Sequence, residues 1–337
     1  MKVFLDITPL TNTNRLRGVG IYTKYLKEYL AKSEKVELVD DLNEADIVHY
    51  PYFDPFFLTL TLKPEKKVIV TVHDLIPVVF PEHFPRGLRG EVKWQIQKRK
   101  LKQVNLVITD STCSRDDIIK HAGVSKEKIQ VIHLAPAPEF RILDKSNLDQ
   151  AHKLPGSFLL YVGDVNWNKN IPGLLRAFAC LTNFPDLHLV LVGQGFFDKS
   201  PETVRINSLV KDLNIEGRVI RLKDLSTAEL VRVYNLATCY VQPSFYEGFG
   251  LPILEAMACG TPVVAGNTSS LPEICGEAAV MVNPDDANKI AEGIEKVVKD
   301  EDVQAKLVQA ELKQVKKFTW KKTTEETIAI YQKVVRL

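Results

Sequence analysis

Short runs of β-branched residues alternate with helical patterns from one end of this chain to the other. In the first half, runs typical of strands occupy residues 2–7, 36–39, 47–50, 68–72, 106–109 and 129–133. In the second half they occupy residues 158–162, 187–192, 219–222, 239–241, 262–264 and 279–282. Strands that alternate with helices are typical of βαβ units, so we predict an α/β fold built on mostly parallel sheets.

Helical patterns fill the intervals between these runs. Apolar residues recur near a period of 3.6 within residues 21–32, and the spacing Ser114-x-x-Asp117 predicts a helix start with a capping side chain. In the second half, helices are predicted at residues 172–181, 203–213, 227–236, 252–258 and 287–298. A last amphipathic stretch at residues 320–335 is expected to return to the first half.

The length of the chain and one break in its pattern predict two doubly wound domains. The 337 residues suggest two domains of about 150 residues each. Around residues 137–156 the periodicity is lost, and prolines with scattered charges predict a linker. We expect Rossmann-like domains at residues 1–150 and 151–318, with a helix at 319–337 that packs back on the first domain. Such domains would face one another across a cleft, because open α/β sheets bind ligands at the carboxyl ends of their strands.

Charge and cysteine content exclude several classes of protein. Lysine and arginine number 44 against 42 acidic residues, and a net charge of +2 gives no reason to expect nucleic-acid binding. The apolar runs fall far short of the roughly 18 to 20 residues that span a bilayer, and the first segment predicts a strand instead of a leader. We therefore expect a cytoplasmic protein. Five cysteines without a C-x-x-C spacing argue against a disulfide framework and a zinc site.

The most informative segment spans residues 245–264. Gly248 and Gly250 let the backbone approach a ligand closely, and Pro252 suits the first position of a helix. A helix that begins after a glycine loop favours an anion such as phosphate at its N-terminus. Glu247 precedes this helix and Glu255 lies about one turn inside it, so the two carboxylates can bind hydroxyls of one molecule. The residues alone leave a plainer interpretation open, in which Glu255 complements the helix dipole and Glu247 is a solvated loop charge.

The run E-G-F-G-L-P-I-L-E-A-M-A-C-G-T-P-V-V resembles the glutamate-x7-glutamate region of retaining nucleotide-sugar glycosyltransferases of glycosyltransferase family 4. The resemblance extends over nearly the whole chain, through TVHDLIPVVFPEHF, LLYVGDVNWNKNIPGLLRAF, LVLVGQG and SLPEICGEAAVMVNP in the order typical of that family. It implies the GT-B fold. It also implies a metal-independent enzyme that moves a sugar from a nucleotide diphosphate sugar to an acceptor hydroxyl, with retention at the anomeric carbon.

The resemblance also implies roles for residues of the second half. Glu247 would contact hydroxyls of the donor sugar, Glu255 would bind the ribose, and Lys169 would neutralise the diphosphate. The donor-binding residues implied by the resemblance further include Gly248, Phe249, Gly250, Leu251, Gly163, Asn168, Gly18 and Gly20. The chain departs from many relatives at one point, because Asp164 and Asn168 stand where an arginine is common. Another group must then help Lys169 to meet the phosphate charge.

In the first half, His73 follows a predicted strand. The resemblance implies that His73 positions the donor sugar near the reacting carbon and does not abstract a proton. Asp74 is expected to hold the loop or to orient His73.

A second glycine segment raises an alternative that the spacing excludes. Gly18-x-Gly20-x-x-Thr23, followed by Asp40, imitates a dinucleotide fingerprint, but the third glycine is missing. Ten residues separate Ile7 from Gly18, too many for the tight turn of that motif. The chain has no P-loop motif, and no D-x-D metal motif stands where a nucleotide-sugar transferase of the other common fold would place it, so we expect no cofactor and no divalent metal.

Residues 86–102 form a basic stretch with one acid, Glu91. A solvated helix face is one interpretation. The other is an acceptor site or a contact with the inner face of the cell membrane, because anionic leaflets attract such clusters and Trp94 and Ile96 are interleaved with the charges. The residues of this candidate patch are Arg86, Arg89, Lys93, Lys98 and Arg99.

The predicted function is transfer of a sugar to a glycan or lipid-linked acceptor in polysaccharide or glycolipid synthesis. The motifs are similar to those of bacterial mannosyl- or rhamnosyl-type transferases, so a mannose-like donor is the first candidate. Two alternatives stay open at this point. One is an epimerase or phosphorylase of the same fold, which would turn over the donor without an acceptor. The other is a non-catalytic subunit that binds nucleotide sugars.

Overall fold

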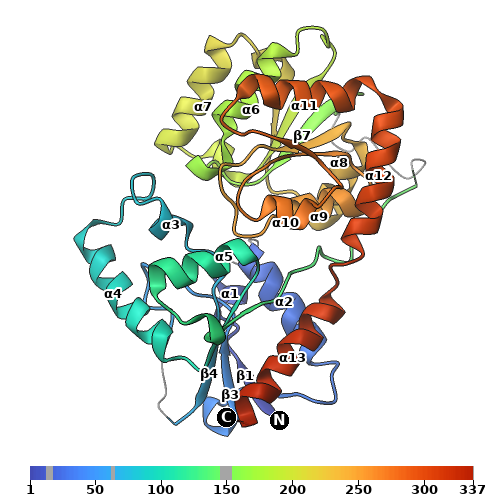
Figure 1. Ribbon diagram of the computed structural model, residues 1–337. Helices are drawn as coiled ribbons and strands as arrows, with labels where there is room; N and C mark the ends of the chain where they lie inside the picture. Colours follow the sequence, from blue (N-terminus) through green and yellow to red (C-terminus); the bar gives the residue numbers. More distant parts are fainter. Residues whose placement is uncertain (13–17, 62–64, 145–153, 337) are drawn as a thin grey trace. The chain divides into compact units, whose positions relative to one another are not determined.

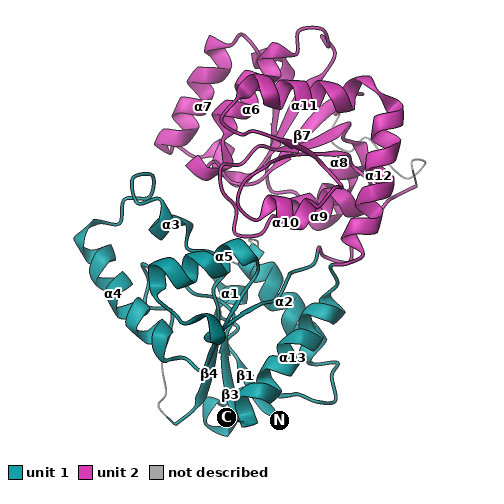
Figure 2. Cartoon of the chain, viewed as in Figure 1, with its two compact units in different colours: residues 1–135, 318–337 teal, residues 136–317 magenta. Residues whose placement is uncertain are grey.

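The computed structural model of the chain describes residues 1–12, 18–61, 65–144 and 154–336. They form two compact units, which are Met1–Ala135 with Phe318–Leu337 and Pro136–Lys317 (Figure 2). The predicted domain boundary at residue 150 lies outside the described residues. The first part of the predicted linker is packed in the second unit, because the Leu143 amide donates to Asn235 Oδ1 at 2.7 Å and the Phe140 ring contacts Tyr234 edge-on.

The first unit is built on a six-stranded, fully parallel sheet (Figure 1). Its strand order is β2-β1-β3-β4-β5-β6. The strands are β1 (Lys2–Leu5), β2 (Glu37–Leu38), β3 (Ile47–Tyr50), β4 (Lys67–Thr71), β5 (Leu106–Thr109) and β6 (Ile129–Val131). The helices are α1 (Thr8–Thr11), α2 (Gly18–Leu30), α3 (Ile76–Val79), α4 (Gly87–Gln103), α5 (Thr112–Asp117) and α13 (Trp320–Arg336).

The second unit contains another six-stranded parallel sheet, in the order β12-β11-β10-β7-β8-β9. Its strands are β7 (Phe158–Val162), β8 (His188–Val192), β9 (Val219–Leu222), β10 (Cys239–Gln242), β11 (Val263–Gly266) and β12 (Val280–Val282). Its helices are α6 (Ile171–Cys180), α7 (Pro201–Asp212), α8 (Thr227–Leu236), α9 (Leu251–Ala258), α10 (Leu271–Cys275), α11 (Ala287–Lys299) and α12 (Glu301–Val315). Every strand range predicted from the sequence overlaps a strand of the structure, and the predicted pair of Rossmann-like parallel sheets is confirmed.

The central strands are buried on both faces. All four residues of β3, β5, β10 and β11 are buried, as expected where helices cover both sides of a parallel sheet. This explains why these segments are continuous apolar runs in the sequence instead of alternating ones. The order of strands reverses beside β7 in the second sheet, where β10 follows on one side and β8 on the other. Ligands of such sheets bind at the carboxyl ends of the strands beside this reversal.

Two local details differ from the sequence expectations. Helix α5 begins at Thr112, two residues before Ser114, because the Ser111 hydroxyl accepts from the Ser114 amide and caps the helix. Gly18 and Gly20 lie in the first turn of helix α2 and not in a loop. A capping serine at Ser111 fits the backbone better, since its extended conformation leaves the hydroxyl facing the first-turn amides.

The last helix of the chain, α13, belongs to the first unit. Trp320 stacks on Tyr25 of α2 at 5.2 Å between ring centroids, and Tyr331 Oη lies 2.6 Å from His49 Nδ1 of β3. Thr323 donates to the His133 carbonyl at 2.7 Å. Within the described ranges, none of the helices combines the length and the apolar character that crossing a membrane requires.

Candidate active site

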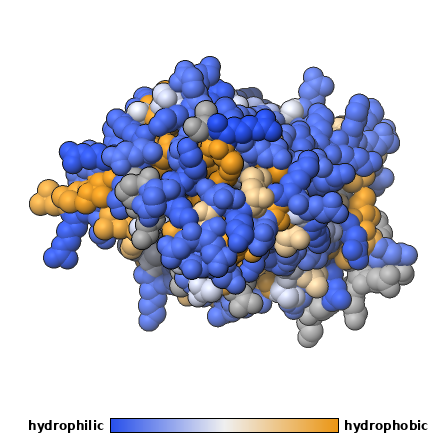
Figure 3. Space-filling view, turned by 90° about the horizontal axis from the view of Figure 1, so that it is seen from below, coloured by the Kyte–Doolittle hydropathy of each residue, from blue (hydrophilic) through white to orange (hydrophobic). Residues whose placement is uncertain are grey.

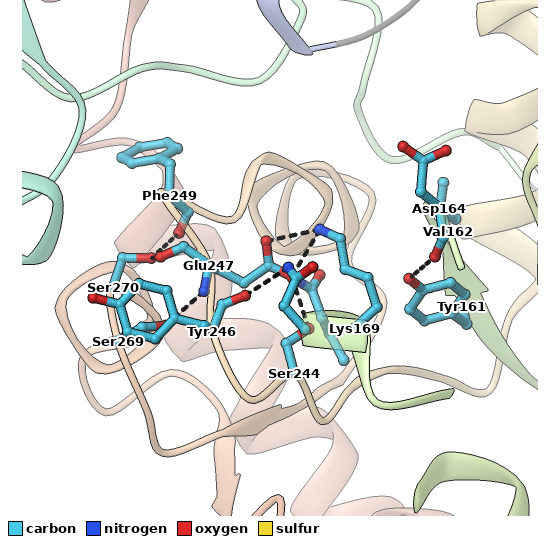
Figure 4. Close-up of polar contacts among 12 residues, drawn as sticks. Tyr161, Val162, Asp164, Lys169, Ser244, Tyr246, Glu247, Phe249, Ser269 and Ser270 are labelled. Carbon is cyan, nitrogen blue, oxygen red and sulfur yellow. Dashed lines mark hydrogen bonds and ion pairs between the residues drawn. The ribbon is translucent and has the colours of Figure 1, made fainter. Parts of the chain in front are cut away.

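The loops that follow β7 and β10 meet at the carboxyl edge of the second sheet (Figure 4). Lys169 closes a short turn, Trp167–Lys169, after β7, and Glu247 lies in the loop between β10 and α9. The two residues are 78 positions apart in the sequence, and the pairing of β7 with β10 brings them together. The stacked rings of Trp167 and Phe245, 5.2 Å apart, join the same two loops.

Lys169 and Glu247 form a close ion pair. Lys169 Nζ donates to both carboxylate oxygens of Glu247, at 2.9 and 2.8 Å. The lysine side chain is 20% exposed, whereas the glutamate side chain is 7% exposed. The Lys169 ammonium group is therefore accessible to a ligand, whereas the Glu247 carboxylate is almost fully buried.

Glu247 is held in one orientation by further donors. Gln242 Nε2 and the Ser244 hydroxyl both donate to Glu247 Oε1, at 2.9 and 2.7 Å. Gln242 is in turn oriented by the Tyr240 hydroxyl, which donates to its Oε1 at 2.6 Å. These donors and Lys169 together hold the carboxylate in place. Sequence reasoning missed Gln242 and Ser244, although their position at the carboxyl end of β10 is a signal that could have located them.

The backbone around Glu247 is tied to its neighbouring loops. The Glu247 amide donates to Ser269 Oγ at 2.9 Å, and the Ser270 hydroxyl donates to the carbonyls of Glu247 and Phe249. From the other side, Asn168 Nδ2 donates to the Tyr246 carbonyl at 2.9 Å. These contacts, visible in Figure 4 for the labelled serines, fix the loop at three points. Ser269 and Ser270 are also residues that sequence reasoning missed, and their position directly after β11 is the signal that locates them.

Helix α9 begins where the sequence predicts. Gly250 is its N-cap with φ of 118°, a region that favours glycine, and a Cβ there would lie 3.0 Å from Leu271 Cδ2. Pro252 occupies the first turn. Gly163, after β7, also has a positive φ of 155°. The segment at the start of α9 is buried at Gly248, Phe249 and Leu251. Its backbone, and not its side chains, is therefore suited to contact a ligand.

Glu255 is buried one turn inside α9. The Tyr234 hydroxyl donates to Glu255 Oε2 at 3.0 Å. Burial raises the pKa of the Glu255 carboxyl to about 7, and the bond from Tyr234 offsets part of this rise. A carboxyl with this pKa changes charge near neutral pH, so its affinity for hydroxyl donors depends on pH.

The two residues that stand in place of an arginine do not supply a cation. Asp164 lies apart from the Lys169–Glu247 pair, with its side chain directed away from it (Figure 4). Asn168 is buried and its side chain joins two loops, so it acts on loop structure. At this part of the edge, the described residues supply positive charge through Lys169 and the N-terminus of α9.

His73 lies in the first unit, two residues after β4. Its Nδ1 is 2.6 Å from Asp110 Oδ2, and its Nε2 is 3.0 Å from the Pro51 carbonyl oxygen. Asp74 accepts from the Ile76 amide at 3.0 Å and so holds the loop. The carboxylate that is hydrogen-bonded to the His73 ring is therefore Asp110, which sequence reasoning missed. Gly18 is exposed and Gly20 is buried at the start of α2 in the same unit.

The basic stretch forms most of helix α4. Arg89 and Arg99 are exposed, whereas Arg86 Nε pairs with Glu91 at 2.7 Å. Lys93 lies over the Phe57 ring at 5.0 Å and Lys98 over the Trp94 ring at 5.8 Å. The interpretation of Trp94 as an interfacial residue is wrong, because its ring is buried in the core of the unit.

In the parts of the chain that the structure describes, no three His, Cys, Asp or Glu side chains are grouped so as to hold a metal ion. All five cysteines are free thiols.

Comparison with known proteins connects this geometry to a family. The profile described as "Glycosyl transferases group 1" matches residues 144–314, and that of "Glycosyltransferase Family 4" matches residues 15–135. The chain is 31% identical to the O-antigen chain mannosyltransferase B of Escherichia coli, over 85% of this chain and 75% of that protein. It is 27% identical to the serotype-specific mannosyltransferase WbdA of Escherichia coli, but spans only 34% of WbdA.

Solved structures agree on the fold. The structure of Anabaena HepE in complex with UDP and glucose matches with a TM-score of 0.78 at 18% sequence identity, over 98% of this chain and 99% of HepE. At that level of identity the similarity establishes the architecture of the chain.

Proposed function

The chain belongs to glycosyltransferase family 4, among the group 1 glycosyl transferases, and from this premise we propose that it transfers a sugar from a nucleotide diphosphate sugar to an acceptor hydroxyl, with retention at the anomeric carbon. The observation that supports this most directly is the ion pair of Lys169 and Glu247 beside the start of α9. A cation, a carboxylate and a helix N-terminus thus lie at one edge of a sheet. The cation and the helix N-terminus suit a diphosphate, and the carboxylate suits the hydroxyls of a sugar.

Each part of the donor has a partner in this proposal. Lys169 and the N-terminus of α9 bind the diphosphate, Glu247 accepts from hydroxyls of the sugar, and Glu255 accepts from hydroxyls of the ribose. His73 of the first unit positions the sugar. When the donor enters, Lys169 exchanges part of its contact with Glu247 for the diphosphate, which leaves Glu247 free to bind the sugar.

Transfer proceeds on one face of the sugar. The bond between the anomeric carbon and the diphosphate oxygen breaks, and the acceptor oxygen forms its bond to that carbon from the same side. The proton of the acceptor hydroxyl passes to an oxygen of the leaving diphosphate. Lys169 and α9 stabilise the charge that develops on this leaving group, so the reaction requires neither a metal ion nor a cofactor.

A mannose-like sugar is the proposed donor group, and a growing bacterial polysaccharide is the proposed acceptor. Two relatives support this choice, the O-antigen chain mannosyltransferase B and WbdA of Escherichia coli. An epimerase or phosphorylase would instead convert the donor without an acceptor, and a binding subunit would hold it without releasing nucleotide diphosphate.

The donor site is tested by thermal unfolding of the purified chain with UDP, GDP, ADP, dTDP and their common sugars. We expect one base to raise the unfolding temperature, since a ligand at 100 times its dissociation constant adds about 2.7 kcal/mol of stability. The effect should be larger at pH 8 than at pH 6, because Glu255, with a pKa of about 7, accepts from ribose hydroxyls best when ionised. Glu255→Ala should lose both the shift and its dependence on pH.

The matched control is Glu292→Ala on α11, where an exposed glutamate pairs with Lys289. It should keep the full shift. Release of nucleotide diphosphate only when an acceptor glycan is added would support transfer. A sugar isomer or sugar phosphate formed without an acceptor would contradict it.

We further propose that helix α4 contacts an anionic membrane surface. Its outer face carries a stripe of apolar residues one turn apart, Leu88, Val92 and Ile96, which are 89%, 60% and 37% exposed. Phe57 and Leu58 are also exposed, and the contact of Lys93 with the Phe57 ring sets that loop beside α4. In Figure 3 most of this face of the molecule is hydrophilic, and hydrophobic side chains project at its left edge, the side of α4 in Figure 1.

Charges accompany this apolar stripe. Within its bounds, α4 has six basic residues and one acid, of which Arg89, Arg99 and Lys102 are exposed. Apolar residues that enter the lipid interface while basic side chains reach anionic headgroups are typical of helices that lie on a membrane.

Sedimentation with vesicles tests this surface. The chain should bind vesicles that contain phosphatidylglycerol and should bind phosphatidylcholine vesicles far less. Leu88→Ser with Val92→Ser should weaken binding by about tenfold or more, because each apolar side chain contributes about 1.5 to 3 kcal/mol when buried. The control is Val204→Ser on α7, an exposed valine of the other unit. Equal binding to both kinds of vesicle, or an equal loss with Val204→Ser, would contradict the proposal.

A further inference from the structure

The ring of His73 is held at both nitrogens by partners from neighbouring strands. His73 follows β4, Asp110 follows β5 and Pro51 follows β3, so three adjacent strand ends meet at this ring. The His73 side chain is 15% exposed and the Asp110 side chain 3% exposed. The ring of Tyr22 packs edge-on against His73 at 5.0 Å between centroids and fixes its plane.

These contacts determine which hydrogens the ring carries. The Pro51 carbonyl oxygen can only accept, so Nε2 of His73 carries a hydrogen. The remaining nitrogen, Nδ1, faces the Asp110 carboxylate at 2.6 Å. The other oxygen of Asp110, Oδ1, is buried and has no hydrogen-bond partner in the described part of the chain, so the charge of this carboxylate is offset chiefly through His73.

The surrounding groups favour a protonated ring. Burial by itself lowers the pKa of His73, but the Asp110 carboxylate, with smaller contributions from the Pro51 carbonyl and Asp74, more than offsets this and holds that pKa above its ordinary value. The nearby His49 of β3 is neutral at physiological pH, because burial lowers its pKa to about 3. Burial raises the pKa of Asp110, whereas His73 and, to a smaller extent, His133 after β6 lower it. The hydroxyl of Tyr22 is bonded to Thr71.

We propose that Asp110 is a positioning residue for sugar transfer, which keeps the His73 ring protonated and in one orientation at the carboxyl end of β4; this inference rests on the proposed function of the chain. With both nitrogens bonded, His73 has no lone pair with which to take a proton from the acceptor. It acts instead as a fixed cation at the carboxyl end of β4. The acceptor proton must then go to the leaving diphosphate, as in the proposed reaction.

The ring can be titrated directly by nuclear magnetic resonance in the full chain labelled with ¹³C-histidine. His73→Gln identifies its signal among those of the seven histidines. We expect His73 to titrate above 6.5, the ordinary value of a histidine pKa. In Asp110→Asn, only the Pro51 carbonyl and Asp74 oppose the effect of burial, so the affinity of the ring for its proton should fall about tenfold or more.

The pH profile of kcat at saturating donor gives a second readout. In the wild type, kcat should fall as pH rises through the pKa of His73. In Asp110→Asn this fall should move to lower pH by the same amount as the ring titration, and Asp110→Glu should restore part of the shift. The control is Ser114→Ala, which removes the bond from the Ser114 hydroxyl to the His73 carbonyl and leaves the ring contacts in place. Its profile should keep the wild-type midpoint.

A His73 that titrates at or below 6.5 in the wild type would overturn the proposal, and this result needs no folded variant of Asp110. An Asp110→Asn variant with an unchanged ring pKa, or with kcat reduced equally at every pH, would also overturn it. The ring titration does not depend on any acceptor. If it follows the expectation while no transfer is detected, the failure belongs to the proposed function and not to the role of Asp110.

Discussion

Replacement of Lys169 by alanine is expected to lower kcat of sugar transfer by about 10² to 10³-fold. The diphosphate gains charge as the bond to the anomeric carbon breaks, and Lys169 is the cationic side chain that contacts Glu247 at the start of α9. Because this interaction strengthens in the transition state, kcat should fall more than KM rises. Initial rates of nucleotide diphosphate release, measured over a range of donor concentrations, separate the two constants.

Two variants make this result specific. Lys169→Arg keeps the charge and should recover part of the rate. Lys223→Ala changes a lysine that follows β9 at the same edge of the sheet but pairs with the exposed Asp224, and it should stay within a few-fold of the wild type. Loss of the Lys169 contact leaves Glu247 bonded to Gln242 and Ser244, so the variant should fold. A Lys169→Ala enzyme with nearly normal kcat would refute the assigned role of this lysine.

The second large effect concerns the stability of the second unit and comes from Glu311 of α12. This side chain is fully buried, and its Oε1 accepts from the Val263 amide at the start of β11 at 2.8 Å. Burial raises the pKa of its carboxyl from 4.5 to about 8, and the bond from Val263 offsets part of the rise. Between pH 4.5 and about pH 8, the Glu311 carboxyl is therefore protonated in the folded protein and ionised in the unfolded chain.

The sign of the effect follows from this difference. Because the folded state holds the proton more tightly, stability falls as pH rises from 4.5 and levels off above about 8. The full loss corresponds to about 5 kcal/mol. Glu311→Gln keeps the acceptor for Val263 and cannot ionise, so it should be of similar stability to the wild type at pH 5 and more stable by several kcal/mol at pH 9.

Urea unfolding at both pH values measures this difference. Glu295→Gln is the control, since this side chain forms a surface pair with Lys299 on α11 and its loss should change stability by less than about 1 kcal/mol. An equal effect of Glu311→Gln at pH 5 and pH 9 would show that the buried carboxyl does not titrate as expected.

Local sequence patterns located the elements of the fold and the loops of the candidate site. The strand ranges follow from runs of apolar residues, because such runs are buried whatever the order of the strands in the sheet. The start of α9 follows from Gly250 and Pro252, whose backbone preferences act within a few residues. Contacts between distant segments have no such signal. Asp110 was missed because its partner His73 lies 37 positions away, and Trp94 was misplaced because its burial depends on the whole core of the first unit.

By itself, the sequence determined the two parallel α/β halves, the glycine loop before α9 and the resemblance to family 4, because periodicity, turn chemistry and motif order are properties of neighbouring residues. The tertiary structure decided which groups meet and how they are charged. The order of strands sets β7 beside β10 and thereby pairs Lys169 with Glu247. Burial then raises the pKa values of Glu255 and Glu311, because removal of water from a carboxyl depends on segments that are far apart in the chain.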